Sequence, residues 1–501
     1  MAQRQRVRRP KRPRALTNQE SLDQLRTWLL PDEHIFSTIR FHGNITWTPI
    51  GLVWLALCWA WSEARHLTDA FAEAHHVCQS MVPCTISTYQ GFMGALVRWT
   101  GTMLPVLRAI IQKRMEQIGG KFWRMDGWVP IAFDGSRSTA PRTKSNEAAF
   151  CASTYGQGKT AKYRKKRSKG MRRKRNQENK GQAPEPQAWT TLLWHMGLRL
   201  PWSWRLGPSD SSERAHVMDL LQTEAFPPHT LFCGDAGFVG YPLWACVLAQ
   251  HSDFLVRIGS NVSLLHEHAH CNLPPKGKER LVLCWPRRVL RADQPPLRLR
   301  LLRVRVGKTW VWILTSVLDA KKLTARAVAR FYQLRWGIEL EFRGLKQTLE
   351  RGKLRCRNSQ RLLTELDWSI LALAVAELLA LREQQAARSK CDRPVDPQRR
   401  SLAGTLRALR NGLRNLKEVP EASKDLPSRL RAAVTDSYRR KRPKAGRYRP
   451  ANGDKKPLGD PKLRGLNKRE QRELHQSCSA RDLRSENTFV QYCARTTAGA
   501  C

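Results

Sequence analysis

The spacing of apolar residues predicts a chain that begins helical, continues as a mixed α/β protein and ends in a polar tail. From residue 18 to about 125, apolar residues recur at helical spacing, and strand-like alternation is scarce. Beyond residue 126, short apolar runs alternate with helical segments, which favours a mixed sheet covered by helices. After about residue 390 the sequence is basic and poor in apolar clusters, so we expect a largely disordered tail in which residues 402–416 are compatible with a short helix.

Two apolar runs in the α/β segment each lead to an aspartate. Residues 129–133 precede Asp134, and residues 230–234 precede Asp235. Each run predicts a buried strand that presents a carboxylate at its tip and is followed by a turn. An aspartate that merely opens an ordinary turn also explains either position.

The segments around the second aspartate complete a recognisable order. Strands are predicted at 189–195 and 198–206, a helix at 211–221, and, after Asp235, a helix at 241–249 and a strand at 253–258. Three strands, a helix and a fourth strand that bears the second Asp are the order of an RNase-H-like core. We therefore expect an α/β protein with a mixed five-stranded sheet, although a fold alone does not establish a function.

Residues 331–346 predict a helix with an apolar face and a polar row beside it. At 100° per residue, Tyr332, Arg335, Glu339 and Lys346 fall within a stripe about 60° wide. The apolar stripe consists of Leu334, Ile338, Phe342, Leu345 and Leu349. A row with one carboxylate, two cations and a phenol suits the wall of a cleft that handles phosphates and metal. An ordinary amphipathic helix with an i,i+4 ion pair explains the same residues.

The spacing Y-x2-R-x3-E-x6-K of this polar row resembles the signature of the insertion-sequence IS-four family of DDE transposases, which are cut-and-paste enzymes. By motif and order, the resemblance covers residues 129–346. It implies that Asp134, Asp235 and Glu339 are the catalytic carboxylates and the ligands of two Mg²⁺ ions, for which Mn²⁺ can substitute. Hard oxygen ligands of this kind suit Mg²⁺. Two such ions would activate the attacking hydroxyl and stabilise the leaving oxygen.

The same resemblance implies that Tyr332, Arg335 and Lys346 bind DNA near the scissile bond. In that family a β-rich insertion lies between the second Asp and the Glu. Residues 259–318 match it, with short β-like runs at 280–285, 297–306 and 309–315. In members of that family, a tryptophan near the end of the insertion stacks on a base that is flipped out of the DNA. Here the matching position holds valine, with Trp310 and Trp312 on either side, and packing of either ring in the core is an equal alternative.

The charge of the chain indicates a polyanionic partner. The formal net charge is +46, from 88 Lys and Arg against 42 Asp and Glu. Residues 159–180 contain 12 of these cations, including Lys165 and Arg172, and form a predicted flexible loop that binds DNA backbone. A solvated, inert run is the alternative. The 13 cysteines contain no CxxC pair, which favours reduced thiols in a cytoplasm, and the apolar run 51–61 is too short to cross a bilayer.

These observations predict a DDE transposase that cleaves transposon ends and transfers the strand into target DNA. We expect a cytoplasmic, nucleoid-associated protein that contacts no membrane and binds terminal inverted repeats and target DNA as a homodimer. A metal-dependent endonuclease without strand transfer and an inactive DNA-binding derivative remain alternatives. The expected domains are a disordered basic arm (1–17), a helical DNA-binding domain (18–125), the first part of the core (126–258), the insertion (259–318), the catalytic and C-terminal helices that complete the core (319–389) and the tail (390–501).

Overall fold

The computed structural model of the chain describes most of its residues. The described ranges are 16–82, 84–151, 185–268, 272–286, 294–386, 393–421, 423–435 and 458–479. The predictions for most of the basic arm and for Lys165 and Arg172 in the basic loop therefore lie outside the described residues. The chain divides into two compact units, one formed by residues up to 114 with 367–436, the other by 115–366 with 437–501.

The first unit is helical among its described residues. Its elements are α1 (Asn18–Leu29), η1 (Glu33–Phe36), α2 (Pro49–Trp61), α3 (Leu67–Gln79), most of α4 (Tyr89–Gly119), most of α12 (Ser359–Gln385), η5 (Pro397–Arg399), α13 (Leu402–Arg414) and α14 (Leu426–Arg431). Thr17 and Glu20 form a capping box at the start of α1. Helix α2 is apolar all round and accordingly buried from Ile50 to Trp61.

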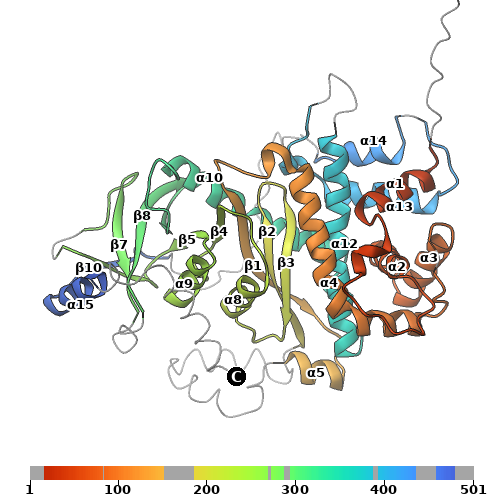
Figure 1. Cartoon of the computed structure of the whole chain (residues 1–501), viewed down its shortest axis with the longest axis horizontal. Helices are drawn as coiled ribbons and strands as arrows, with labels where there is room; N and C mark the ends of the chain where they lie inside the picture. Colours follow the sequence, from red (N-terminus) through yellow and green to blue (C-terminus); the bar gives the residue numbers. More distant parts are fainter. Residues whose placement is uncertain are drawn as a thin grey trace, which may run out of the picture. The chain divides into compact units, whose positions relative to one another are not determined.

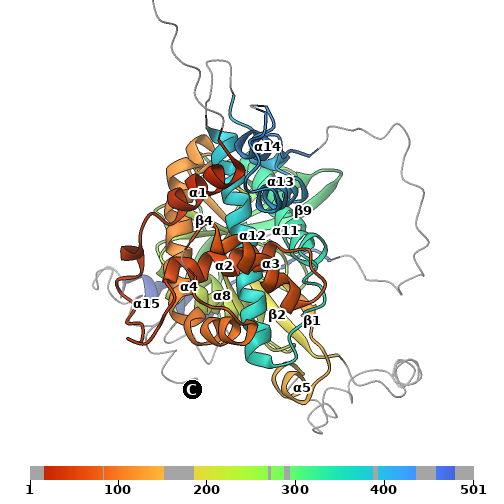
Figure 2. The same cartoon turned by 90° about the vertical axis from the view of Figure 1, so that its right-hand side faces the viewer.

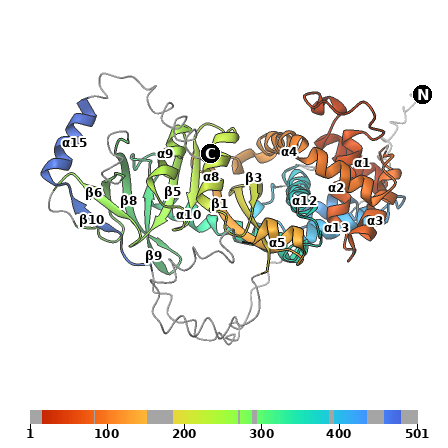
Figure 3. The same cartoon turned by 90° about the horizontal axis from the view of Figure 1, so that it is seen from below.

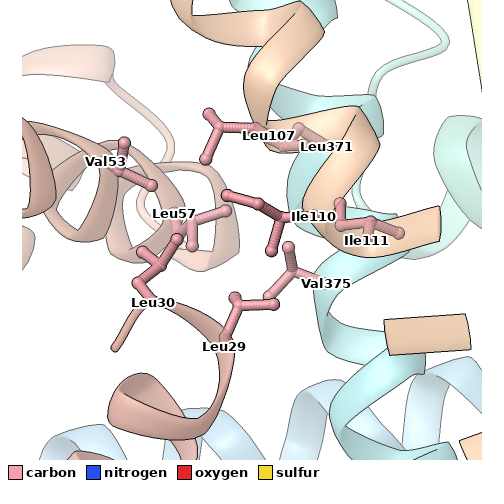
Figure 4. Close-up of a pocket in the computed structure, with 9 residues that line it drawn as sticks. All are labelled: Leu29, Leu30, Val53, Leu57, Leu107, Ile110, Ile111, Leu371 and Val375. Carbon is pink, nitrogen blue, oxygen red and sulfur yellow. The ribbon is translucent and has the colours of Figure 1, made fainter. Parts of the chain in front are cut away.

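Helices α4 and α12 run alongside each other within this unit (Figures 1 and 2). The indole of Trp368 donates a hydrogen bond of 2.8 Å to the hydroxyl of Thr100, and the indole of Trp61 donates one of 2.8 Å to the carbonyl of Ala372. Nine apolar side chains from α1, α2, α4, α12 and Leu30 surround a cavity of about 10 Å³ (Figure 4). That volume holds one water molecule at most, so the cavity is a packing defect and no ligand site.

The second unit is built on one mixed sheet, which has ten strands among the described residues. They are β1 (Val129–Thr139), β2 (Gln187–His195), β3 (Leu200–Gly207), β4 (Thr230–Gly234), β5 (Asp253–Ile258), β6 (Ser263–His266), β7 (Glu279–Cys284), β8 (Leu297–Val306), β9 (Thr309–Thr315) and β10 (Lys462–Gly465). Their spatial order is β10-β6-β7-β8-β9-β5-β4-β1-β2-β3. Strands β1, β4 and β5 are parallel, and β2 and β3 are antiparallel neighbours. The β-rich segment 259–318 thus extends the sheet that carries the aspartates.

Helices lie on both faces of this sheet. The helices of this unit are η2 (Gly120–Phe122), α5 (Lys144–Phe150), α8 (Glu213–Thr223), α9 (Tyr241–Ala249), α10 (Ala325–Arg335), α11 (Gly337–Arg343), the π-helical turn η4 (Gly344–Thr348) and α15 (Lys468–Ser479), of which α8, α9, α10 and α11 pack on its strands. Figure 3 shows α8 and α9 on one face and α10 on the other. Right-handed crossovers from β1 to β4 and from β4 to β5 account for α8 and α9 sharing a face.

The segment predicted as a largely disordered tail is ordered in several places. Helices α13 and α14 belong to the first unit, and β10 pairs in parallel with β6 at the edge of the sheet. Leu466, which directly follows β10, and Leu474 of α15 join a buried cluster with Leu265 and Leu283. The short helix expected at 402–416 corresponds to α13, whereas the prediction of disorder was wrong for α14, β10 and α15. At β10 and α15 a few apolar residues suffice because they cover an existing sheet edge. No described helix is long and apolar enough to cross a membrane.

Candidate active site: carboxylates around Arg335

Strands β1 and β4 place Asp134 and Asp235 side by side. The two strands pair in parallel, with Ala132 opposite Cys233 as the last paired residues. Asp134 and Asp235 each lie two residues beyond this last pair, in the same direction, so the two aspartates are level with each other just past the paired region. Adjacent strands are about 4.8 Å apart. The predicted pair of aspartates is therefore brought together by the sheet.

The position of Asp134 within its strand differs from the prediction. Asp134 was expected at the tip of a strand, but β1 continues to Thr139 as the antiparallel partner of β2. Only the pairing with β4 stops before Asp134. Asp235, by contrast, directly follows β4, as predicted. The carboxylates thus lie where the sheet opens between β1 and β4.

Asp134 is largely buried, and each of its carboxylate oxygens contacts a donor. Its Oδ1 accepts the backbone N–H of Gly135 at 2.9 Å, and its Oδ2 lies 3.4 Å from Nη1 of Arg335. Burial raises the pKa of Asp134, the Gly135 and Arg335 contacts lower it, and the charge of Asp235 raises it again. Asp235 accepts the backbone N–H of Gly237 at 2.7 Å. The two aspartates are therefore electrostatically coupled.

Arg335 connects Asp134 with Glu339. Its side chain is 3% exposed, and its Nη2 lies 3.9 Å from Oε1 of Glu339, whose own side chain is 46% exposed. The guanidinium also lies over the rings of Tyr332 and Trp336, at 5.6 and 5.1 Å from their centroids. Burial raises the pKa of Glu339, Arg335 lowers it, and the charges of both aspartates raise it. The structure therefore brings all three predicted carboxylates into one electrostatic cluster.

The predicted continuous helix over 331–346 is broken. Helix α10 ends at Arg335, α11 begins at Gly337, and a π-helical turn follows from Gly344. At the break, a Cβ on Gly337 would lie 2.3 Å from Cη2 of Trp194, so only glycine allows this close approach. The indole of Trp194 then donates to Glu341 at 3.2 Å. The single 100° projection is thus wrong across residue 336.

The polar row is also more buried than predicted. Tyr332 and Arg335 are each 2% exposed, so truncating either would leave a cavity, contrary to a row that only flanks the core. Lys346 is half-buried in the π-helical turn, where burial lowers its pKa. Its ammonium makes no ion pair with a described residue. The structure thus sets the Arg335 guanidinium over the ring of Tyr332.

The two tryptophans of the insertion have different surroundings. Trp312 is 5% exposed, its indole donates to Asp460 at 2.7 Å, and Arg303 lies 5.0 Å from its centroid. Trp310 is 36% exposed, with Lys276 5.9 Å from its centroid. Packing explains Trp312, whereas Trp310 retains a ring that a partner could reach.

A fourth carboxylate, Glu213 of α8, lies in the same cluster and was missed by the sequence analysis. Its pKa is raised to about 7, first by burial and then by the charges of Asp134 and Asp235, while Arg137 lowers it. An acidic residue in the first turn of a helix is common because it favours the helix dipole. The sequence around Glu213 therefore gave no signal of proximity to the aspartates.

The chemistry of this donor set fits a divalent cation. Carboxylate oxygens are the ligands that Mg²⁺ and Mn²⁺ prefer. The pKa values of Asp134, Glu213 and Glu339 are raised first by burial and then by the neighbouring carboxylates, and a bound cation would lower all three. In the described part of the chain, no three His, Cys, Asp or Glu side chains converge to hold an ion, and Asp134 and Glu339 face Arg335.

A family model of known proteins agrees with this chemistry. The family model described as "Transposase DDE domain" matches residues 130–375, a segment that contains all four carboxylates. The match supports a transposase, and this domain family generally uses divalent metal ions. Among solved structures, a "piggyBac transposase synaptic complex with hairpin DNA" is 12% identical, with 83% of this chain and 85% of that chain covered and a TM-score of 0.35. No curated protein matches the chain.

Proposed function

We propose that this protein is a cut-and-paste DDE transposase, of the IS-four type that its Tyr332–Lys346 spacing resembles. It would cleave DNA at transposon ends and join the released end to target DNA. The observation that carries the proposal is the register of β1 and β4, which sets Asp134 beside Asp235, together with the shared contact of Arg335 with Asp134 and Glu339. These residues lie inside the segment that matches the transposase domain.

Asp134, Asp235 and Glu339 would hold the divalent ions, for which we propose Mg²⁺. Bound there, two ions would activate the attacking hydroxyl and stabilise the leaving oxygen. Arg335 keeps the Asp134 and Glu339 carboxylates charged and oriented, because its buried guanidinium favours their ionised forms. The strand order β3-β2-β1-β4-β5 supports our assignment of this part of the sheet to an RNase-H-like core.

DNA is the proposed partner, bound as terminal inverted repeats and then as target. The net charge of +46 favours a polyanion, and phosphate neutralisation by Lys and Arg supplies most non-specific affinity for DNA. Trp310, Lys346 and the basic loop with Lys165 and Arg172 are the proposed contacts. We propose a homodimer in the DNA complex, so that two ends are held together.

The test is a strand-transfer assay. The substrate is a labelled duplex that carries the DNA flanking the reading frame, mixed with a supercoiled plasmid and Mg²⁺ or Mn²⁺. The proposal predicts cleaved ends and labelled plasmid joined to them. Cleavage without joined product would favour the endonuclease alternative, and binding without cleavage would favour an inactive DNA-binding derivative.

A further inference from the structure

Trp194 of β2 lies on the same face of the sheet as Asp134. It is opposite Ala132 in the pairing of β1 with β2, and Asp134 follows Ala132 by two residues, so the three side chains share one face. The pairing of β2 with β3 shifts register between Leu193 and Trp194, and such a bulge re-aims the side chain beside it. The fully buried indole is directed toward α11, which packs on β1.

Two contacts join Trp194 to α11. A Cβ on Gly337 would lie 2.3 Å from Cη2 of the ring, so the first turn of α11 rests directly on the indole. The indole N–H donates to Oε2 of Glu341 at 3.2 Å, and Glu341 is itself buried. The guanidinium of Arg199 also lies 5.8 Å from the ring centroid. A single side chain of β2 thus contacts α11 both at its start and further along.

The contact with Glu341 fixes how α11 is turned about its own axis. Glu339 and Glu341 are two residues apart, which is about 200° around a helix, so they lie on opposite sides of α11. Glu341 is buried against Trp194, whereas Oε1 of Glu339 lies 3.9 Å from Nη2 of Arg335. A rotation of α11 that broke the hydrogen bond to Trp194 would therefore also move Glu339 away from Arg335.

The break between α10 and α11 makes this anchor important. The N–H of Trp336 donates to the carbonyl of Gln333 at 3.3 Å, and the N–H of Glu339 donates to the carbonyl of Trp336 at 3.2 Å. Both bonds span three residues, as in a 3₁₀ turn. A continuous α-helix would fix Glu339 relative to Arg335 through its own backbone ladder. Across this break, side-chain contacts outside the helix have to do so.

We propose that Trp194 and Glu341 are positioning residues for the proposed cleavage reaction and together orient the Glu339 carboxylate toward Asp134 and Asp235. The inference rests on the proposed function, because Glu339 is one of its three carboxylates. Packing alone does not account for Glu341, since burying a carboxylate is costly where an apolar side chain could fill the space. An acceptor for the indole N–H, by contrast, sets the rotation of α11.

The experiment uses the full-length protein and a duplex that carries the DNA flanking the reading frame. It measures the single-turnover cleavage rate at saturating DNA with Mg²⁺, and the dissociation constant for the same duplex. Trp194→Phe keeps a ring but removes the donor, and Glu341→Leu removes the acceptor. Each should cleave about 10- to 100-fold more slowly, as when a group that orients a metal ligand is lost, with an unchanged dissociation constant. Glu341→Gln retains an acceptor oxygen and should cleave close to the wild-type rate.

The double variant Trp194→Phe/Glu341→Leu separates positioning from stability. It removes donor and acceptor together, so that neither is left buried without the other. It should cleave no more slowly than the slower single variant, because both substitutions break the same contact. Trp368→Phe is the matched control, since its indole also donates a buried hydrogen bond, to Thr100, but belongs to the other unit. It should cleave as the wild type does.

Three results would overturn the inference. A wild-type cleavage rate in Trp194→Phe or in the double variant would mean that Glu339 does not depend on this contact. A slow Glu341→Gln, or an equal loss of rate in Trp368→Phe and Trp194→Phe, would reduce the effect to charge or to stability, which thermal melting of each variant measures. Absence of cleavage by the wild type would contradict the proposed function as well, whereas the first two results would leave that function standing.

Discussion

Arg335 is the side chain that two of the proposed catalytic carboxylates share. An exposed i,i+4 pair with Glu339 would contribute only about 0.2–0.5 kcal/mol. The structure instead buries the guanidinium and sets it 3.4 Å from Asp134, which is itself largely buried. Removing one member of a buried pair leaves the other charge uncompensated, at a cost of about 3–5 kcal/mol. Asp134 retains some exposure, so the lower end of that range applies.

We therefore expect Arg335→Ala to lower the free energy of unfolding by about 3 kcal/mol. Arg343→Ala is the control, because Arg343 is exposed on α11 and should change stability by less than about 0.5 kcal/mol. Urea unfolding of both variants measures the difference. Equal stability of the two variants would mean that Arg335 contributes no more than an ordinary surface ion pair with Glu339.

Glu213 provides a prediction on pH. Its pKa is raised from 4.5 to about 7 in the folded protein, so the folded state binds a proton more tightly than the unfolded state. The stability contributed by the neutral carboxyl is present below pH 4.5 and is lost as the pH rises through about 7. In metal-free protein, the melting temperature of Glu213→Gln should therefore rise relative to that of the wild type between these pH values. A pH-independent difference would contradict the raised pKa.

At the scale of elements, the apolar pattern predicted β8 and β9 with the bounds that the structure shows. Strand β1 was predicted too short, because its polar second half is held by pairing with β2, which local sequence does not reveal. The break at Trp336 was missed for a similar reason. It depends on Trp194, about 140 residues away, and the sequence window around Gly337 contains no proline that would signal it.

Gly337→Ala tests that break. The added methyl would meet the buried ring of Trp194 at 2.3 Å and should destabilise the protein by about 1–3 kcal/mol through overpacking. Gly101→Ala, in α4, has nothing within 4 Å of its added methyl and should stabilise the protein by up to about 1 kcal/mol. Thermal melting should therefore show a lower melting temperature for Gly337→Ala and an equal or higher one for Gly101→Ala. A neutral Gly337→Ala would mean that the approach to Trp194 is not tight.

At the scale of the whole molecule, the sequence suggested a helical domain at 18–125 and a separate core, interrupted by an insertion, that the helices of 319–389 complete. The structure instead groups residues up to 114 with 367–436. Contacts such as that of Thr100 with Trp368 join segments far apart in sequence, and apolar periodicity shows only that a face is buried, not its partner. Asp134 and Asp235 could be singled out because the apolar strand that leads to each is a local pattern, and Glu339 because it fits the spacing of the transposase signature. Glu213 could not, since its neighbours are set by the fold.

The basic loop 159–180 lies outside the described residues, and its DNA-binding role stays a prediction. Replacing it with a Gly/Ser segment of equal length should weaken binding to any duplex. The slope of log K against log[salt] should become shallower by roughly 0.9 for each phosphate that the loop no longer neutralises. Fluorescence anisotropy on two unrelated duplexes measures this slope. An unchanged slope would mean that the loop does not contact DNA phosphates. Weaker binding to only one of the two duplexes would mean that the loop recognises bases.

The central claim is that Asp134, Asp235 and Glu339 form one metal-dependent cleavage site. The most direct measurement is cleavage of duplexes from the DNA flanking the reading frame, in Mg²⁺ or Mn²⁺, by the wild type and by Asp134→Asn, Asp235→Asn and Glu339→Gln. We predict cleavage by the wild type only, abolished by EDTA, with DNA binding retained in all three variants. Near-normal cleavage by any one folded variant, or cleavage that persists without a divalent ion, would contradict the account.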